Sequence, residues 1–250
     1  MSRFYVSPED VRDDKIYISG KEVRHIVKVL RLRKGDRIIA FDGSGKEYLA
    51  SIEKASRTAV VVGIEEIRFQ KGSQRLSITL AQAIPRKGGM DYIVQKCSEL
   101  GVSRIIPIQT ARTVVRLEGK NRQLCRKRWQ KLAVEASKQC GRVLVCDIDD
   151  LRSFEDSLEI LNDYDLALIP CLAEGAKPLK DVLISYKGRT ISLGERLKVL
   201  IFIGPEGDFT PQEIEEAKAA GAIPVALGEN VLRSDTAAVV SVAIVNYEFE

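Results

Sequence analysis

Two glycine-containing stretches near the end of the chain carry residues that could bind a ligand and act on it. The first reads GPEGDF at 204–209, and the second reads LGENVLRSDTA at 227–237. Each follows a short apolar run typical of a buried strand and precedes a segment that begins like a helix. Because loops at the carboxyl ends of parallel strands commonly bind ligands in α/β proteins, two such neighbouring loops could enclose a flat, neutral molecule.

The first of these loops differs from the known phosphate-binding patterns. GPEG matches neither the dinucleotide fingerprint nor the P-loop, and the carboxylate of Glu206 would repel a phosphate. The helix that follows is strongly specified, with Thr210 at the N-cap and Glu213 at capping-box spacing. Structural turns and caps therefore remain an alternative for both loops, since Ser234 or Asp235 can cap the last helix.

The elements that position these loops belong to the second of two predicted domains. In residues 1–71, a helical pattern at 23–32 precedes alternating strands over 36–66, which predicts a small β-barrel with one helix. The polar stretch QKGSQ at 70–74 ends this pattern. In residues 72–250, buried-looking strands alternate with helices, which predicts an α/β domain with a parallel sheet. The predicted strands are 76–84, 103–110, 165–172, 198–204 and 222–228, and the predicted helices are 90–102, 126–140, 211–221 and 236–249.

The positive charge of the chain is concentrated in two segments. The net charge is only +4, but residues 20–37 carry seven Lys or Arg against two acids, and residues 111–142 carry ten against two. Local charge decides affinity for phosphates, so these segments favour a nucleic-acid partner over a pair of merely solvated helix faces. Trp129 lies among the second set, where burial in an amphipathic helix is favoured over stacking on a base.

The composition argues against several other classes of protein. Five cysteines without a C-x-x-C pair and a single histidine, His25, make a zinc site or a disulfide framework improbable, and no metal is expected. No apolar run has the length of a membrane span, and the first residues lack the apolar centre of a secretory signal. The expected location is therefore the cytoplasm, with no membrane partner.

Taken together, the two loops resemble the paired motifs of the SPOUT-class methyltransferases, and specifically the RsmE family. Further matches are RFYV at 3–6, HIVKVLRLRKGD at 25–36, KGGMDYIVQKCSELGVSRIIPI at 87–108 and EASKQCGR at 135–142, so the resemblance covers nearly the whole chain. It implies a PUA-like RNA-binding domain followed by a trefoil-knotted α/β domain that binds S-adenosyl-L-methionine and forms a homodimer. The implied reaction is methylation of N3 of one uridine in bacterial 16S ribosomal RNA.

Three positions depart from the family pattern. Asp208 stands where the family usually has a second glycine, and Asp235 stands where it usually has Glu before Thr-Ala. The proline that commonly follows QCGR is missing, and VLVCDI occupies 143–148 instead. Asp for Glu keeps the charge but shortens the side chain by one methylene, which affects the geometry of that carboxylate more than the reaction class.

Methylation of uridine N3 requires loss of its proton, so the site must favour the delocalised imide anion. A cationic donor near O2 or O4 would do this. Arg233 is the first candidate and Arg142 the second, both with a surface or phosphate-contact role as the alternative. Asp235 and Glu135 are possible bases, whereas His25 is better explained as packed or RNA-contacting, and bulk water could suffice.

Cofactor and RNA contacts can be assigned from the same motifs. The resemblance implies that the cofactor is held largely through backbone and apolar groups of the two loops. These residues are Ile203, Gly204, Glu206, Gly207, Leu227, Gly228, Val231 and Leu232. RNA phosphates are expected to contact basic residues of both domains. These residues are Arg3, Arg24, Arg31, Arg33, Arg86, Lys87, Arg126, Lys127 and Arg128.

Three other functions are compatible with parts of this sequence. A related methyltransferase acting on another RNA would differ by a few pocket side chains. A non-catalytic ribosomal RNA-binding protein would keep the basic segments but would not need intact GPEG and LRSDTA loops. An enzyme acting on a small phosphorylated metabolite would leave the barrel and both basic segments without a role, and Glu206 would be misplaced. The expected substrate is the 16S RNA in the assembled 30S subunit, because recognition by shape and phosphate needs a folded RNA surface.

Overall fold

The computed structural model describes residues 1–69, 75–86, 88–190 and 196–249. Its contacts divide the chain into two compact units. One comprises Met1–Gly72 with Ser137–Val145, and the other comprises Ser73–Ala136 with Cys146–Glu250. The predicted boundary near residue 72 lies outside the described residues. The sequence did not predict that Ser137–Val145 packs with the first unit.

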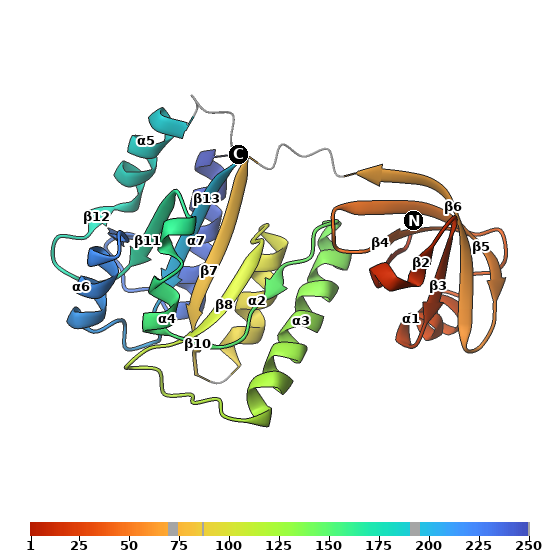
Figure 1. The fold of residues 1–250 in the computed structure, drawn as a ribbon, viewed down its shortest axis with the longest axis horizontal. Coiled ribbons are helices and arrows are strands. Elements are labelled where there is room, and N and C mark those ends of the chain that lie inside the picture. Colours follow the sequence, from red (N-terminus) through yellow and green to blue (C-terminus); the bar gives the residue numbers. More distant parts are fainter. Residues whose placement is uncertain (70–74, 87, 191–195, 250) are drawn as a thin grey trace. The chain divides into compact units, whose positions relative to one another are not determined.

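The first unit is built on a six-stranded sheet with the order β1-β4-β5-β6-β3-β2 (Figure 1). Only β1 and β4 are parallel neighbours, and the other pairs are antiparallel. The alternation at 36–66 thus forms strands as predicted. The strands are β1 (Arg3–Tyr5), β2 (Val11–Arg12), β3 (Lys15–Ser19), β4 (Arg37–Phe41), β5 (Lys46–Ala55) and β6 (Ala59–Phe69).

The helical pattern at 23–32 forms two consecutive short helices. The first, α1 (Lys21–Arg24), continues into a π-helical turn, η2 (His25–Val29), and a 3-10 turn, η1 (Pro8–Asp10), lies before β2. The core between helix and sheet contains Phe4, Ile26 and Ile38, all fully buried. His25 is exposed and touches the Phe4 ring edge-on at 5.8 Å between ring centroids.

The segment Ser137–Val145 is joined to the first unit by specific contacts. Lys138 donates to Glu22 at 2.7 Å, in an ion pair whose two side chains are largely covered. Leu144 forms a β-bridge with Gly43, and the Val145 N–H donates to the Gly43 carbonyl. A Cβ on Gly43 would meet Val145 at 3.1 Å, so glycine permits this close approach.

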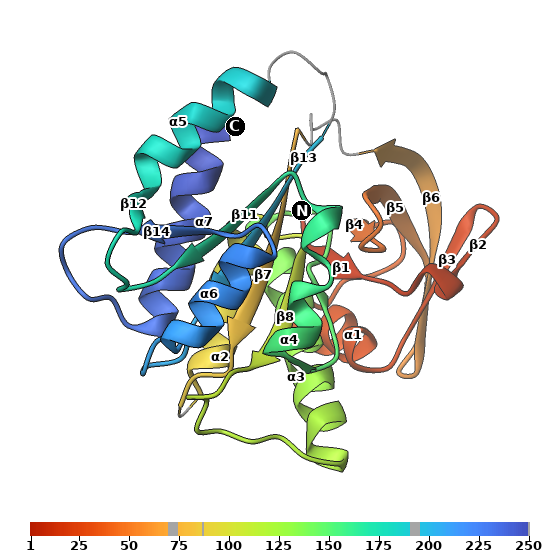
Figure 2. The same cartoon turned by 60° about the vertical axis from the view of Figure 1, so that its left-hand side comes forward.

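The second unit is a parallel α/β sheet with the order β10-β8-β7-β13-β11-β14-β12 (Figure 2). All its strand pairs are parallel, as the alternation of strands and helices predicted, and β9 pairs with β8 beside this path. Its strands are β7 (Leu76–Ala83), β8 (Arg104–Gln109), β9 (Asp147–Ile148), β10 (Arg152–Ser153), β11 (Leu166–Pro170), β12 (Lys177–Pro178), β13 (Leu197–Ile203) and β14 (Ile223–Ala226).

Helices cover both faces of this sheet (Figures 1 and 2). Phe154 of α4 and Ile214 of α6 enter the core on one face, while α2 and α7 pack together on the other. No described helix has the length and apolar character needed to cross a membrane. The helices are α2 (Gly89–Glu99), α3 (Lys120–Cys140), α4 (Phe154–Leu158), α5 (Leu179–Thr190), α6 (Pro211–Ala219) and α7 (Ser234–Phe249), with a 3-10 turn η3 (Leu161–Asp163).

The strand order places β11 between β13 and β14, although β11 precedes both in the sequence. Three loops that follow parallel strands therefore leave the sheet side by side at one edge. Such a point, where the strand order departs from the chain order, is where α/β proteins bind ligands.

Candidate functional site

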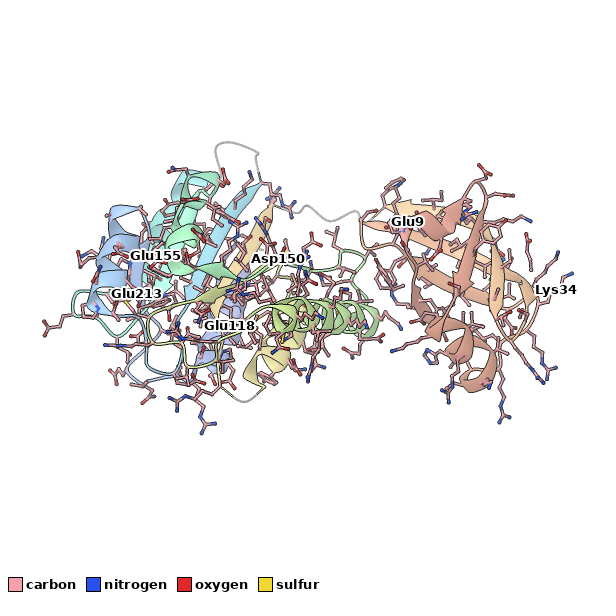
Figure 3. All side chains as sticks on the ribbon, turned by 60° about the horizontal axis from the view of Figure 1, so that its bottom comes forward. Glu9, Lys34, Glu118, Asp150, Glu155 and Glu213 are labelled. Carbon is pink, nitrogen blue, oxygen red and sulfur yellow. The ribbon has the colours of Figure 1, made fainter. Side chains whose placement is uncertain are left out.

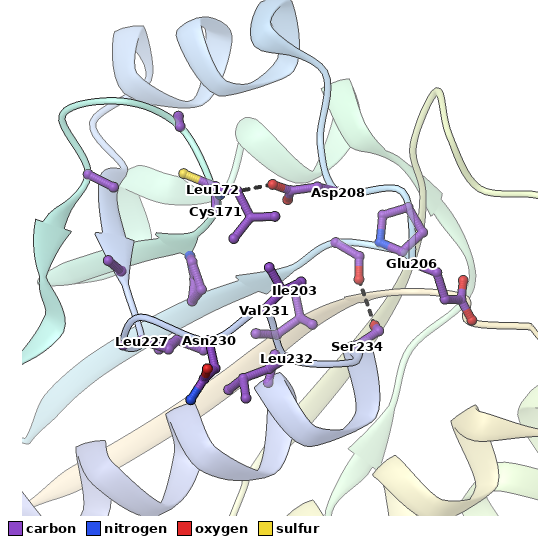
Figure 4. A pocket seen from close by; sticks show the side chains of 18 residues that line it. Cys171, Leu172, Ile203, Glu206, Asp208, Leu227, Asn230, Val231, Leu232 and Ser234 are labelled. Atoms are coloured by element: carbon purple, nitrogen blue, oxygen red, sulfur yellow. Dashed lines mark hydrogen bonds between the residues drawn. The ribbon is translucent and has the colours of Figure 1, made fainter.

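A pocket of about 280 Å³ lies at the carboxyl ends of β11, β13 and β14 (Figure 4). Its walls are the three loops that leave these strands, together with the first turn of α7. Every lining residue belongs to the second unit. The lining residues are Pro170, Cys171, Leu172, Ala173, Ala176, Ile203, Gly204, Pro205, Glu206, Asp208, Ala226, Leu227, Gly228, Asn230, Val231, Leu232, Ser234 and Ala237.

The loop after β13, residues 204–210, is anchored to the neighbouring β8 loop. Arg112 donates from one guanidinium nitrogen to the carbonyls of Gly207 at 2.7 Å and Phe209 at 3.2 Å. Buried Glu213 accepts from the backbone N–H groups of Ala111 and Thr210. The predicted capping box is confirmed, because the Glu213 N–H in turn donates to the Thr210 hydroxyl.

Further hydrogen bonds tie this loop to the loops after β7 and β11. Glu206 accepts from the backbone N–H of Arg86 at 2.7 Å, which gives the acidic residue of GPEG a structural partner. Asp208 accepts from the backbone N–H of Leu172 at 2.9 Å. A Cβ on Gly204 would lie 3.2 Å from the Phe209 ring, so a side chain at the strand end would have to displace this ring by a few tenths of an ångström.

The loop after β14, residues 227–233, is much less anchored. Gly228 to Val231 and Arg233 are exposed, and the Val231 side chain is 73% exposed. In the described part of the chain, no side chain of this loop makes a hydrogen bond, and only the Arg233 carbonyl accepts one, from the Ala237 N–H. Gly228 has φ +146°, a conformation that favours glycine.

A buried chain of hydrogen bonds joins the ends of the two loops beneath the pocket. The Ser234 hydroxyl donates to the Gly204 carbonyl at 2.6 Å (Figure 4). It also accepts from the Gln82 side-chain amide at 3.0 Å. Gln82 is fully buried on β7, and its amide also donates to the Ala83 carbonyl. Ser234 thus fixes the start of α7 against the end of β13, which holds both loops at one place.

The charge of the pocket argues against a ligand that carries a phosphate group. Its only charged lining side chains, among the residues the structure describes, are the carboxylates of Glu206 and Asp208. Burial raises the pKa of the Cys171 thiol, so this group is neutral near pH 7. A lining with carboxylates and without a cation repels phosphate and suits a neutral or positively charged molecule.

The structure brings most of the predicted cofactor residues together. Ile203, Gly204, Glu206, Leu227, Gly228, Val231 and Leu232 all line the pocket. Gly207 is not among the lining residues. A Cβ there would meet the Arg112 side chain at 3.4 Å, an ordinary contact distance, so Arg112 lies directly against this glycine.

The sequence did not identify the third wall, which is formed by Pro170 to Ala173 with Ala176 after β11. Cys171 is buried, and its N–H donates to the Val225 carbonyl of β14. The available signal was weak. The strand at 165–172 was predicted, but CLAEGA has no motif, and only the insertion of β11 beside β13 brings this loop to the pocket.

The predicted catalytic residues fall in two different units. Arg233 is exposed and directly precedes the pocket residue Ser234, and Asp235 follows it. The Asp235 carboxylate accepts from the Thr236 N–H at 2.7 Å, as expected for an acid in the first turn of a helix. Arg142 lies in Ser137–Val145, the segment that packs with the first unit.

The predicted RNA contacts are also divided between the units. Arg3 is mostly covered, since it pairs with Glu47 and lies 5.2 Å from the centre of the Phe41 ring, so its guanidinium supports the first unit. Lys87 lies outside the described residues. The exposed members of the set are Arg24, Arg31, Arg33 and Arg86, with Arg126, Lys127 and Arg128 on α3.

Two of the cations on α3 already interact with neighbouring groups of the protein. Arg126 donates to the Ile148 carbonyl, and Arg128 pairs with Asp91. Lys127 is exposed. Trp129 is only 6% exposed, which confirms the prediction that this ring packs in the protein.

Residues 72–246 match the family model described as RNA methyltransferase domain, and residues 18–65 match the RNA methyltransferase PUA domain. The chain belongs to the RNA methyltransferase family. It is 31% identical to the ribosomal RNA small subunit methyltransferase E of Bacillus subtilis, with 93% of this chain and 90% of that protein covered. The Synechocystis protein of the same name is 28% identical, with 98% and 77% covered.

Solved structures of similar proteins extend these findings. A ribosomal RNA small subunit methyltransferase E from Neisseria gonorrhoeae, bound to S-adenosyl methionine, is 28% identical with a TM-score of 0.83, over 99% of this chain and 97% of that one. A putative methyltransferase from Legionella pneumophila, with bound cofactor SAM, is also 28% identical, with a TM-score of 0.84 over 98% and 96%. This RNA methyltransferase therefore shares its fold with cofactor-bound relatives along the whole chain.

Proposed function

We propose that this protein transfers a methyl group from S-adenosyl-L-methionine to N3 of a uridine in 16S ribosomal RNA, with the assembled 30S subunit as substrate. The observation that carries the proposal is the pocket at the ends of β11, β13 and β14, in a chain that belongs to the RNA methyltransferase family. The names of the relatives, small subunit methyltransferase E, support the choice of RNA. The uridine and its N3 follow from the resemblance of the two loops to the RsmE motifs.

The chemistry of the pocket fits S-adenosyl-L-methionine. Ile203 and Leu232 offer apolar surface for an adenine ring, and the bare backbone at Gly204 and Gly228 allows close approach of a ligand. The carboxylates of Glu206 and Asp208 suit a molecule with a positive sulfonium and an ammonium group. When bound, this cofactor supplies an activated methyl group.

Arg233 is the residue we assign to the uridine. Its side chain makes no ion pair within the described residues, and it directly precedes pocket residue Ser234. A guanidinium beside O2 or O4 stabilises the imide anion and so lowers the pKa of N3; the N3 proton then leaves to bulk water, and the lone pair on N3 is exposed for attack. The Asp235 carboxylate accepts from the Thr236 N–H, so it is held in the first turn of α7, two residues after Arg233.

The RNA-binding role of the first unit rests on its exposed cations and its match to a PUA domain of RNA methyltransferases. Arg24, Arg31, Arg33 and Lys34 are all exposed around the helical segment, and the Lys34 side chain points into solvent (Figure 3). These cations, with Lys127 of α3, would contact phosphates and orient the RNA without reading its sequence. Since the ribosome is the substrate, the site of action is the cytoplasm.

A homodimer is part of the proposal because α7 is apolar on all sides. Val242 and Val245 pack inside the unit, whereas Val239 and Ile244 stay half-buried and the Tyr247 side chain is 88% exposed. A helix that is apolar all round normally has both faces covered. A second copy packed on the outer face of α7 would satisfy this.

The test is transfer of a labelled methyl group from S-adenosyl-L-methionine to purified 30S subunits, followed by nucleoside analysis of the 16S RNA. The expected product is N3-methyluridine in 30S subunits, with much less in naked 16S RNA or in 50S subunits. Gly228→Trp, which fills the pocket from the loop after β14, should abolish both cofactor binding and transfer while the fold is kept. If the label appeared in a different RNA or at a different atom, the protein would still be an RNA methyltransferase, but with a substrate other than the one proposed here.

A second experiment examines RNA binding alone. Reversal of Arg126, Lys127 and Arg128 to Glu should weaken binding and flatten its dependence on salt, because fewer counterions are released. An unchanged salt slope would show that this face of α3 does not meet RNA. Cofactor binding without any transfer to RNA would favour a non-catalytic RNA-binding protein.

A further inference from the structure

Asp208 occupies a backbone conformation that glycine adopts more easily. Its φ is +59°, in the left-handed region, and it stands where the RsmE pattern has a second glycine. Asp tolerates this region better than most residues, but the conformation still disfavours a side chain. A carboxylate at this position therefore calls for interactions that only a side chain can make.

The Asp208 carboxylate bridges two walls of the pocket. Its Oδ1 accepts from the N–H of the next residue, Phe209, at 2.8 Å, which fixes the carboxylate within its own loop. Its Oδ2 accepts from the Leu172 N–H at 2.9 Å, in the loop after β11 (Figure 4). Both carboxylate oxygens are thus occupied by backbone donors, one from each loop.

This bridge restrains a segment that otherwise has few anchors. The Cys171 N–H donates to the Val225 carbonyl of β14, whereas the Leu172 side chain is 64% exposed. From Leu172 to Ala176 the loop turns back, and the Ala176 N–H donates to the Ala173 carbonyl. The bond to Asp208 therefore joins the exposed part of this loop to the loop after β13.

The same carboxylate adds negative charge to a pocket that has no lining cation among its described residues. Burial raises the pKa of the neighbouring Cys171 thiol; the charge of Asp208 adds to that rise, whereas Lys218 opposes it. Because Asp208 itself lines the pocket, its negative field acts on a ligand bound there. Methyl transfer converts a sulfonium into a neutral thioether, so such a field acts differently on cofactor and product.

We propose that Asp208 is a positioning and specificity residue of the pocket, which latches the Cys171–Leu172 segment to the loop after β13 and favours the cationic cofactor over its demethylated product. The second part rests on the proposed function, since it assumes S-adenosyl-L-methionine as the ligand. The latch itself is independent of the ligand. The carboxylate attracts the positive sulfonium of the cofactor but not the neutral thioether of the product, so the product is released more easily.

Two variants separate the latch from the charge. Asp208→Gly suits φ +59° and removes both the bridge and the charge. Asp208→Asn also tolerates this φ, and its one amide oxygen can still accept from the Leu172 N–H, at the loss of the bond from the Phe209 N–H, but it carries no charge. Glu229→Gln, at an exposed position of the loop after β14 that does not line the pocket, is the control for general surface charge. Asp13→Gly, at φ +52° in the first unit, is the control for relief of left-handed backbone.

The latch is measured by hydrogen–deuterium exchange of the segment 171–176 in the ligand-free protein. We expect exchange of the Leu172 amide to rise about tenfold in Asp208→Gly, because its acceptor is gone, and to stay unchanged in Asp13→Gly. Equal exchange in the parent and Asp208→Gly would overturn the latch. Circular dichroism verifies that each variant is folded.

The charge effect is measured by calorimetric titration with S-adenosyl-L-methionine and with S-adenosyl-L-homocysteine. We expect the ratio of the two dissociation constants to shift about fivefold toward the neutral product in Asp208→Asn, and not in Glu229→Gln. An unchanged ratio in Asp208→Asn, or an equal shift in Glu229→Gln, would overturn the specificity role. If the parent binds neither molecule, the proposed function and the specificity role fail together, while the exchange experiment still decides the latch.

Discussion

The two loops that face each other across the pocket are held in opposite ways. Residues 204–210 after β13 are fixed by Arg112, by buried Glu213 and by the N–H groups of Arg86 and Leu172. Residues 227–233 after β14 are mostly exposed and, within the described part of the chain, make no side-chain hydrogen bond. One wall is therefore preorganised, whereas the other can adapt to ligand and RNA.

This difference separates binding from chemistry. A rigid wall of backbone and carboxylates defines the shape that a cofactor must fit, and substitutions there should act on affinity and stability. The less anchored wall carries Arg233, and substitution of this residue should act on the rate of transfer. Each of the following variants tests one side of this comparison.

The largest effect is expected from Arg233→Ala. Loss of a cation that stabilises the imide anion should lower the turnover number for methyl transfer on the order of a hundredfold to a thousandfold, with the affinity for S-adenosyl-L-methionine unchanged. Transfer to 30S subunits under single-turnover conditions and calorimetric titration measure the two quantities. Arg75→Ala, at an exposed position just before β7, is the matched control. Turnover close to that of the parent would remove Arg233 from the site.

Glu213→Ala should have the next largest effect, which we expect on the stability of the protein and not on the rate of transfer. The carboxylate is 5% exposed and accepts from the N–H groups of Ala111 and Thr210. Its loss leaves two donors without a partner, which lowers the free energy of unfolding by about 2–3 kcal/mol. Urea denaturation measures this. Glu215→Ala on the same helix removes an exposed ion pair with Lys218, so it should change stability by less than about 0.5 kcal/mol. Equal effects would mean that the β13 loop is not held by Glu213.

Two glycine variants compare the walls directly. A Cβ on Gly204 would lie 3.2 Å from the Phe209 ring and 3.3 Å from an Asp208 carboxylate oxygen, whereas no atom lies within 4 Å of a Cβ on Gly228. Gly204→Ala should therefore weaken binding of S-adenosyl-L-methionine by about tenfold. Gly228→Ala meets only the strain of φ +146° in a loop that can relax, so we expect a smaller, roughly threefold loss. The reverse order would show that the β14 loop is the rigid wall.

Local sequence patterns correctly predicted the strands and helix starts that depend on interactions between residues close in the sequence. The strands 198–204 and 222–228 and the Thr210–Glu213 capping box follow from apolar runs, glycines and capping residues a few positions apart. The residues of both loops could therefore be assigned to a pocket before their geometry was known. The trefoil knot implied by the resemblance stays a prediction.

Other features depend on pairings that are distant in the sequence. The wall after β11 joins the pocket only because β11 inserts between β13 and β14. The same holds for the segment Ser137–Val145, which packs with the first unit although the helical pattern of α3 continues to Cys140 without a break. Its contacts there are the ion pair of Lys138 with Glu22 and the β-bridge of Leu144 with Gly43.

The ion pair of Arg3 with Glu47 is another pairing of distant residues. It covers most of the Arg3 side chain, and a count of charges along the sequence cannot show this.

Arg112→Ala should give the smallest effect, and it tests how the rigid wall is held. Its guanidinium donates to the Gly207 and Phe209 carbonyls from outside, where water competes for the same acceptors. Its removal should destabilise the protein by about 0.5–1 kcal/mol, with a twofold to threefold rise in the dissociation constant for S-adenosyl-L-methionine and an unchanged turnover number. Urea denaturation and calorimetry measure these changes, and Arg122→Ala, which removes a similar bond to the Leu117 carbonyl, is the control. A loss of affinity as large as that expected for Gly204→Ala would mean that the Arg112 side chain shapes the wall, whereas the small loss expected here leaves that role to Glu213 and Gly204.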